Sequence, residues 1–128
     1  MKLTASNSYD GVTTVSNGML EVRNDCALGS TNGNTVAYCK AGGFIQLTGT
    51  NVVAEPLVLD GERPGSAFSL YSAGGSNTWT GLITKRNGNV RISAGGSSTL
   101  VIKGGVTSAG AGLLISVSGA YDKLIYAE

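Results

Sequence analysis

The residues of this chain with the most obvious capacity for chemistry are three carboxylates in one short stretch. Glu55, Asp60 and Glu62 lie close together in the sequence, and Arg63 follows directly. Carboxylates beside an arginine can bind calcium or cleave glycosidic bonds by acid and base catalysis. Such a site also needs long loops that build a cleft, whereas segment 61–66 has the glycine, serine and proline content of a tight turn. We therefore expect a structural turn and no catalytic residue, with a carbohydrate-cleaving site as the alternative.

Other catalytic and metal-binding chemistry is limited by the residue types that the chain lacks. The sequence contains no histidine, which excludes histidine triads, histidine general bases and most zinc sites. Its two cysteines cannot by themselves make a structural zinc site. We expect no cofactor and no metal ion.

The charge of the chain argues against nucleic acids and anionic membranes as partners. The net charge is +1, and Lys85-Arg86 is the only adjacent pair among nine scattered basic residues. We interpret this pair as a solvated strand edge whose positive charge opposes aggregation. No apolar run approaches the ~20 residues of a membrane helix, and the N-terminus has no signal-peptide pattern. The chain is expected to be intracellular, or a piece of a secreted protein whose export signal lies elsewhere.

Short strands must position any functional residues, because no stretch of useful length has helical periodicity. Glycine accounts for 20 residues, proline for 2 and charged residues for 13% of the chain, a composition typical of short strands with tight turns. Apolar residues alternate with small or polar ones, as in a strand with one buried face. The alternation predicts one continuous core that contains Leu20, Val22, Ile45, Leu47, Leu57, Leu59, Val90, Ile92, Leu100 and Ile102.

An internal repeat organises this pattern. Residues 7–22 are echoed by residues 77–92 at an offset of about 70 residues, without a gap. The two copies agree in turn residues and in apolar positions together, and each is typical of a strand, an Asn-Gly turn and a second strand. The matched positions include Asn7 with Asn77, Tyr9 with Trp79, Gly11 with Gly81, Thr14 with Thr84, Leu20 with Val90 and Val22 with Ile92.

Two all-β architectures are compatible with these strands. A sandwich or small barrel would use the three Asn-Gly pairs as hairpin turns. A β-solenoid would use the same glycines as corners between parallel strands, with small residues stacked from coil to coil. The in-register repeat, the short connections and the low aromatic content of 6% favour the solenoid. We predict a single domain over residues 1–128, with about five or six coils and no significant helix.

The N-terminal segment resembles a known repeat family. Residues 3–22, L-T-A-S-N-S-Y-D-G-V-T-T-V-S-N-G-M-L-E-V, are similar to the autotransporter-associated β-strand repeat, and the similarity continues to about Gly119. The resemblance implies a right-handed parallel β-helix in a secreted or cell-surface bacterial protein, usually as tandem stretches of a long passenger region. The residues on the pattern are Leu3, Thr4, Asn7, Tyr9, Gly11, Thr13, Thr14, Val15, Gly18, Leu20 and Val22.

The export that this resemblance implies bears on the two cysteines. In an exported protein, a disulfide between Cys26 and Cys39 would close one loop and stabilise the fold by ~3 kcal/mol. Two buried thiols, or cysteines that pair between chains, are the alternatives.

Exposed aromatic rings could stack on sugars and so support a carbohydrate-binding function. The match of Tyr9 with Trp79 favours packing in a repeated structural position instead. The aromatic residues are Tyr9, Tyr38, Phe44, Phe68, Tyr71, Trp79, Tyr121 and Tyr126.

These observations together predict a non-enzymatic rod or stalk segment of an extracellular or cell-surface protein. Strand-like residues run to both ends, with Leu3 and Thr4 at one and Leu124, Ile125 and Tyr126 at the other. We expect the termini to be in phase and copies to stack head to tail into an open filament, or to meet adjacent repeats. Adhesion to a host or matrix surface is a further expected role. The alternative is a carbohydrate-binding or polysaccharide-cleaving β-helix module.

Overall fold

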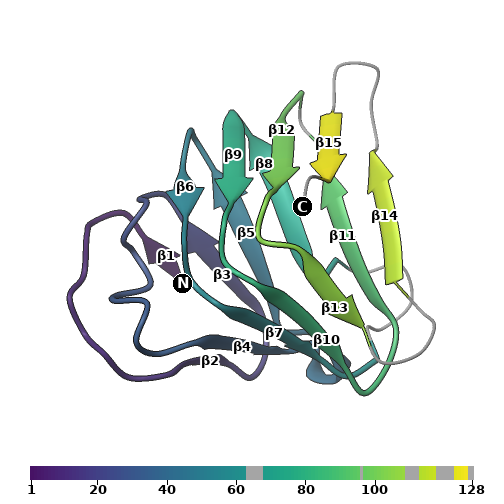
Figure 1. Cartoon of the computed structure of the whole chain (residues 1–128), viewed down its shortest axis with the longest axis horizontal. Coiled ribbons are helices and arrows are strands. Elements are labelled where there is room, and N and C mark those ends of the chain that lie inside the picture. Colours follow the sequence, from purple (N-terminus) through teal and green to yellow (C-terminus); the bar gives the residue numbers. More distant parts are fainter. Residues whose placement is uncertain (63–67, 96, 109–112, 118–122, 127–128) are drawn as a thin grey trace.

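The computed structural model describes residues 1–62, 68–95, 97–108, 113–117 and 123–126. The chain forms a parallel β-solenoid of about four turns with three sheets along its sides (Figure 1). Every strand pairing among these residues is parallel, so the hairpin sandwich and the small barrel are wrong. The helix found in this part of the chain is the single turn η1 (Cys39–Ala41), which confirms the expected all-β class.

The three sheets run along the solenoid, and each is named here by a letter. Sheet A holds β1 (Lys2–Leu3), β3 (Met19–Val22), β5 (Phe44–Thr48), β8 (Leu70–Gly74), β11 (Val90–Ala94) and β14 (Leu113–Val117). Sheet B holds β2 (Thr13–Val15), β4 (Thr35–Tyr38), β7 (Leu57–Asp60), β10 (Ile83–Arg86) and β13 (Val106–Ser108). Sheet C holds β6 (Val52–Val53), β9 (Ser76–Trp79), β12 (Thr99–Ile102) and β15 (Lys123–Tyr126). Each full turn takes the chain through sheet B, then A, then C.

The internal repeat corresponds to three turns of the solenoid. In sheet B, Thr13 pairs with Thr35, and the same column continues through Leu57 to Ile83. Positions 13 and 83 therefore lie in one column, at the offset of 70 residues that the sequence repeat has. The repeat is a property of the stacked turns and not of a separate subdomain.

In sheet A the gap-free alignment is wrong by two residues. The column that begins at Leu20 continues through Ile45 and Leu70 to Ile92, so Leu20 is equivalent to Ile92 and not to Val90. The β5–β8 pair has a register irregularity after Leu47. Because two residues are one full period of a strand, the shifted side chains stay on the inner face.

The core lies in the space between the three sheets. All ten residues that the alternation places there are buried, and eight of them have no exposed surface. Burial of each such aliphatic side chain contributes about 1.5–3 kcal/mol. The strands of successive turns supply these side chains in columns, which is why the narrow aliphatic core continues along the axis.

Glycines at one corner let successive turns approach closely. Where sheet C leads into sheet B, the column consists of Gly11, Gly33, Glu55, Gly81 and Gly104. A Cβ atom at Gly81 would collide with the backbone of Glu55, and one at Gly104 would collide with the backbone of Gly81. The corner therefore requires glycine for lack of space, and Glu55 is its single exception.

Candidate functional site

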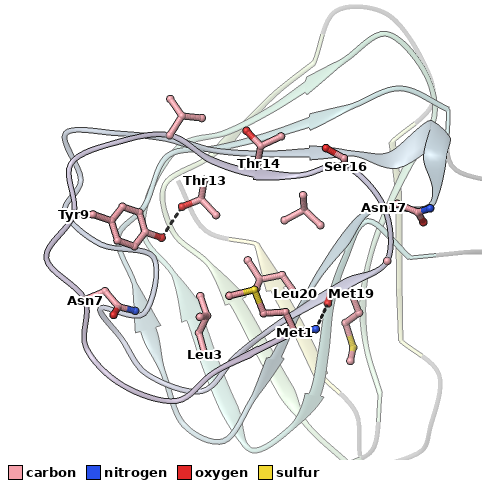
Figure 2. A pocket seen from close by; sticks show the side chains of 13 residues that line it. Met1, Leu3, Asn7, Tyr9, Thr13, Thr14, Ser16, Asn17, Met19 and Leu20 are labelled. Atoms are coloured by element: carbon pink, nitrogen blue, oxygen red, sulfur yellow. Dashed lines mark hydrogen bonds between the residues drawn. The ribbon is translucent and has the colours of Figure 1, made fainter.

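A hollow lies at the N-terminal end of the solenoid, where the first turn leaves the core open (Figure 2). Its volume is about 920 Å³. Strands β2 and β3 supply its walls on two sides, and the loop before β2 surrounds the rest (Figure 2). The apolar residues that line this N-terminal hollow are Met1, Leu3, Tyr9, Val12, Val15, Met19 and Leu20.

The loop of residues 4–12 takes the place that a strand of sheet C occupies in later turns. The Tyr9 hydroxyl and the Thr13 hydroxyl share a hydrogen bond of 2.6 Å across the mouth (Figure 2). The side-chain amide of Asn7 donates to the carbonyl of Ala27 at 2.7 Å, which ties the loop to the next turn. The loop is therefore fixed around the hollow and leaves its centre accessible.

The strands beside the hollow present unused backbone groups. In β2, the N–H of Thr13 donates to Asn34, so the N–H and carbonyl of Thr14 point away from the solenoid. In β1, the carbonyls of Met1 and Leu3 accept hydrogen bonds from the N–H groups of Glu21 and Arg23. The carbonyl of Lys2 therefore points away from β3, towards the open end of the solenoid. Within the described ranges no strand pairs with these outward edges. Sheets A and B can each accept a further parallel strand here.

Sheet C is closed at the same end. Its first strand, β6, is two residues long, and the N–H of Val52 donates to the carboxylate of Asp25 at 2.8 Å. A side-chain acceptor therefore occupies the position that a strand would use. The three sheets thus differ at this end, because A and B are open whereas C is blocked by a carboxylate.

The two ends do not continue each other strand for strand. Among the described strands the last is β15 in sheet C and the first is β1 in sheet A. Within the chain a strand of sheet C is followed by one of sheet B, as β6 is followed by β7. Two copies placed end to end would therefore have no described strand of sheet B between β15 of one copy and β1 of the next.

The three carboxylates singled out in the sequence do not share a cleft. Glu55 faces the interior, where 2% of its surface is exposed. Asp60 lies on the outer face of sheet B, where Arg86 Nη2 is 2.6 Å from its carboxylate. Glu62 accepts hydrogen bonds from the backbone and side-chain amides of Asn89, at 2.8 and 2.7 Å. Arg63 lies outside the described residues. The strand alternation and the corner separate these groups.

The outer face beside Asp60 is a structural ion-pair cluster. Burial by itself would raise the pKa of Asp60, but the hydrogen bonds from Arg86 and Asn87 and the charge of Arg86 outweigh it, so this pKa lies below its usual value. Lys85, next to Arg86, points inward in the column of Leu59 and is 3% exposed. The expectation of a solvated Lys85-Arg86 pair is thus wrong for Lys85, because adjacent strand residues face opposite sides.

Both cysteines are free thiols, which corrects the expected disulfide. Cys26 is exposed in the turn that follows the C-terminal end of β3. Cys39 is buried in η1, which precedes the N-terminal end of β5. Because β3 and β5 are adjacent parallel strands, the two thiols lie at opposite ends of sheet A. A disulfide requires Cα atoms closer than about 7 Å, which this placement prevents.

The aromatic residues do not form one sugar-binding platform. Trp79 has no exposed surface, and its indole N–H donates to the carbonyl of Glu55 at 2.8 Å. Phe68 and Tyr71 stack with their ring centroids 4.1 Å apart, and the guanidinium of Arg91 lies 4.7 Å from the Phe68 centroid. Each ring of this pair therefore uses one of its faces to contact the other ring. The side chains of Tyr121 and Tyr126 lie outside those described.

The sequence patterns identified parts of the N-terminal hollow and missed the rest. Leu3 was predicted as an end residue and Leu20 as a core residue, and both line the hollow. Thr4 is exposed beside β1. The contributions of Val12 and Met19 were missed, although an apolar residue that breaks the alternation next to a glycine turn is a detectable signal. The backbones of Leu124, Ile125 and Tyr126 belong to β15, which pairs with β12.

Comparison with known proteins gives no further identification, because no family model, curated protein or solved structure matches this chain. The described part of the chain holds no helix long and apolar enough to cross a membrane. It also brings together no group of three or more potential metal-binding side chains. The class that the fold defines is a parallel β-solenoid.

Proposed function

We propose that the chain is a structural rod segment without enzymatic activity, which lengthens by receiving a turn of a neighbouring solenoid unit at its N-terminal hollow. The observation that carries this proposal is the coincidence of an apolar hollow with the open edges of β1 and β2. A further solenoid turn would fill the hollow with side chains and pair both edges by β-augmentation. The neighbouring unit is a second copy of the chain or an adjacent repeat.

A rod role also agrees with how the polar residues are used. Asp60 binds Arg86, Glu62 binds Asn89 and Asp25 caps β6, so these carboxylates connect turns to each other. Their placement supports a structural role over the carbohydrate-cleaving alternative. Phe68 and Tyr71 each use one ring face to stack on the other, so those two faces are not free to stack on a sugar.

The finer features of the proposal rest on the sequence resemblance. We propose a right-handed solenoid of five or six coils related to the autotransporter-associated β-strand repeat. The corresponding location is the cell surface or the extracellular space, where such a rod would act as a spacer, a fibre or an adhesive stalk against a host or matrix surface.

End-to-end contact of two copies sets a geometric condition. An incoming sheet-A strand can follow β14, but the joint is one strand short in sheet B. A heterologous contact of this kind gives an open filament when the same step repeats. The shortfall predicts that copies of this chain associate more weakly than covalently linked repeats would.

Electron microscopy and light scattering on the purified chain test the proposal. We expect fibres or concentration-dependent oligomers. Thr14→Pro should abolish them, because proline removes the outward N–H of β2 and leaves the bonds from β2 to β4 in place. Thr14→Val keeps that N–H and is the matched control, and Ile125→Lys should block the other end. A monomer that persists at high concentration would overturn self-stacking.

A further inference from the structure

Glu55 is the single side chain in a column of glycines. It occupies the corner between sheets C and B, with Gly33 in the preceding turn and Gly81 in the following one. A glutamate here must direct its carboxyl away from the tightly stacked backbone. The side chain is 2% exposed, so it projects into the interior of the solenoid.

The carboxyl group of Glu55 is only partly satisfied there. Its Oε1 atom accepts a hydrogen bond from the Thr35 hydroxyl at 3.3 Å, and Thr35 is itself fully buried. Its Oε2 atom is buried and has no hydrogen-bond partner within the described ranges. An ionised carboxylate with one neutral donor and no cation would be strongly disfavoured in such a place.

We propose that Glu55 is a proton-binding site that acts as a latch: the corner between sheets C and B is closed when the carboxyl is protonated and loosens when it ionises. The neutral carboxyl fits an apolar interior, whereas the carboxylate must draw in water or move outward. Either movement disturbs the stacking of Glu55 on Gly81. The ligand is the proton itself, and the latch joins three successive turns through Thr35, Glu55 and Trp79.

The groups around Glu55 leave it without a compensating charge. The strands packed against it are β4, β6, β7, β9 and β10. In the part of the chain that the structure describes, the titratable side chains that these strands and the following turns direct inward are Cys39, after β4, and Lys85, in β10. Lys85 lies at the level of Leu59, four residues along the chain from Glu55, or about 13 Å of extended strand. Lys85 therefore lies beside the C-terminal end of β7, away from the carboxyl group of Glu55.

The direction of the pH response follows from this environment. Burial raises the pKa of Glu55 above its ordinary value, and the bond from Thr35 opposes this only in part. A raised folded-state pKa means that the folded protein binds the proton more tightly than the unfolded chain does. Its stabilising effect is complete below the ordinary pKa of a glutamate. It is lost as the pH rises through the higher, folded-state pKa.

Other shifted carboxylates act in a different pH range. For both Glu21 and Asp60, burial alone would raise the pKa, but hydrogen bonds from Arg23 and from Arg86 lower it below the usual value. Their contributions are present above the ordinary pKa and are lost as the pH falls through the folded-state pKa. Of these three carboxyl groups, only that of Glu55 is expected to titrate on the alkaline side of its ordinary pKa.

Trp79 is a built-in reporter of the latch, because it is the only tryptophan and its indole N–H binds the Glu55 carbonyl. We expect its fluorescence emission to shift to longer wavelength as the pH rises from 4 towards 9, with one apparent pKa. Glu55→Gln, which cannot ionise, should remove this transition. Glu62→Gln changes an exposed carboxyl and is the matched control that should retain it.

A direct titration keeps the proposal testable if Glu55→Gln fails to fold. Carbon NMR of the wild-type protein with labelled glutamate should show one carboxyl that titrates above the ordinary range. Loss of the fluorescence transition in Glu55→Gln, or that NMR signal alone, supports the latch. The proposal is overturned if every glutamate titrates at or below its usual pKa, or if Glu55→Gln retains the transition of the wild type.

Discussion

The two copies of the internal repeat share a sequence pattern and differ in their surroundings. Asn7, in the first copy, is half-buried and donates to the carbonyls of Ala27 and Ala5. Asn77, in the second copy, is fully buried. It accepts from the side-chain amide of Asn51 at 2.9 Å and donates to Ser72 at 2.9 Å. An asparagine thus fixes a loop at the N-terminal end of the solenoid, whereas in the middle of the solenoid an asparagine connects successive turns.

The aromatic position differs in the same way. Tyr9 is 40% exposed at the mouth of the N-terminal hollow, whereas the equivalent Trp79 has no exposed surface. Trp79 pairs with Val53 on one side and with Ile102 on the other, so turns cover it from both directions. Within the described structure, the following turn covers Tyr9 on one side, and no turn covers its other side. The comparison teaches that a repeat defines a position, and that the neighbouring turns decide its burial.

The largest effect should come from the aromatic position. Trp79→Ala removes a fully buried ring and should lower the free energy of unfolding by about 3–5 kcal/mol. Tyr9→Ala removes a partly exposed ring and should cost about 1 kcal/mol or less. Urea titrations followed by circular dichroism measure both. Equal losses would break the comparison, because they would mean that Tyr9 is as tightly packed as Trp79.

The aliphatic column of sheet A should show a smaller difference between the two regions. Ile92→Ala creates a cavity inside the middle of the solenoid and should cost about 3–5 kcal/mol. Leu20→Ala enlarges a hollow that is already open and should cost about 2 kcal/mol. The same urea titrations apply. A Leu20 variant that loses less than about 0.5 kcal/mol would contradict its burial in the core.

The asparagine position should follow with a still smaller effect. Asn77→Ala leaves the amide of Asn51 and the hydroxyl of Ser72 without their partner, and should cost about 1–3 kcal/mol. Asn7→Ala releases the loop of the first turn and should leave global stability within about 0.5 kcal/mol. Thermal unfolding compares the two variants. A larger loss in Asn7→Ala would show that the loop supports the whole fold.

The cysteines sharpen the comparison without any change in stability. Cys26 is exposed in the first turn, and burial raises the pKa of the Cys39 thiol. A thiol reagent should therefore modify Cys26 in the native protein and Cys39 only after unfolding. Mass spectrometry after brief labelling identifies the modified residue. Labelling of both thiols at equal rates, or of neither, would contradict the assigned burial.

The sequence by itself determined the local features of this protein. Alternation of apolar and polar residues predicts the strands and the core side chains, since the period of two is a property of the extended backbone. Glycine and asparagine clusters predict the corners, and the repeat predicts that equivalent strands stack. These features depend on neighbours along the chain, so a pattern such as Leu57-Val58-Leu59 is sufficient to reveal them.

Only the tertiary structure decided what lies above and below each residue. The neighbours of a side chain in its column come from other turns, and the turns differ in length, so the sequence does not fix which residues meet. This is why Glu55 replaces a glycine in its column, why Lys85 points inward, and why Cys26 and Cys39 lie apart. The open N-terminal hollow follows from the same cause, because a position in a solenoid is buried only when a turn covers it on each side.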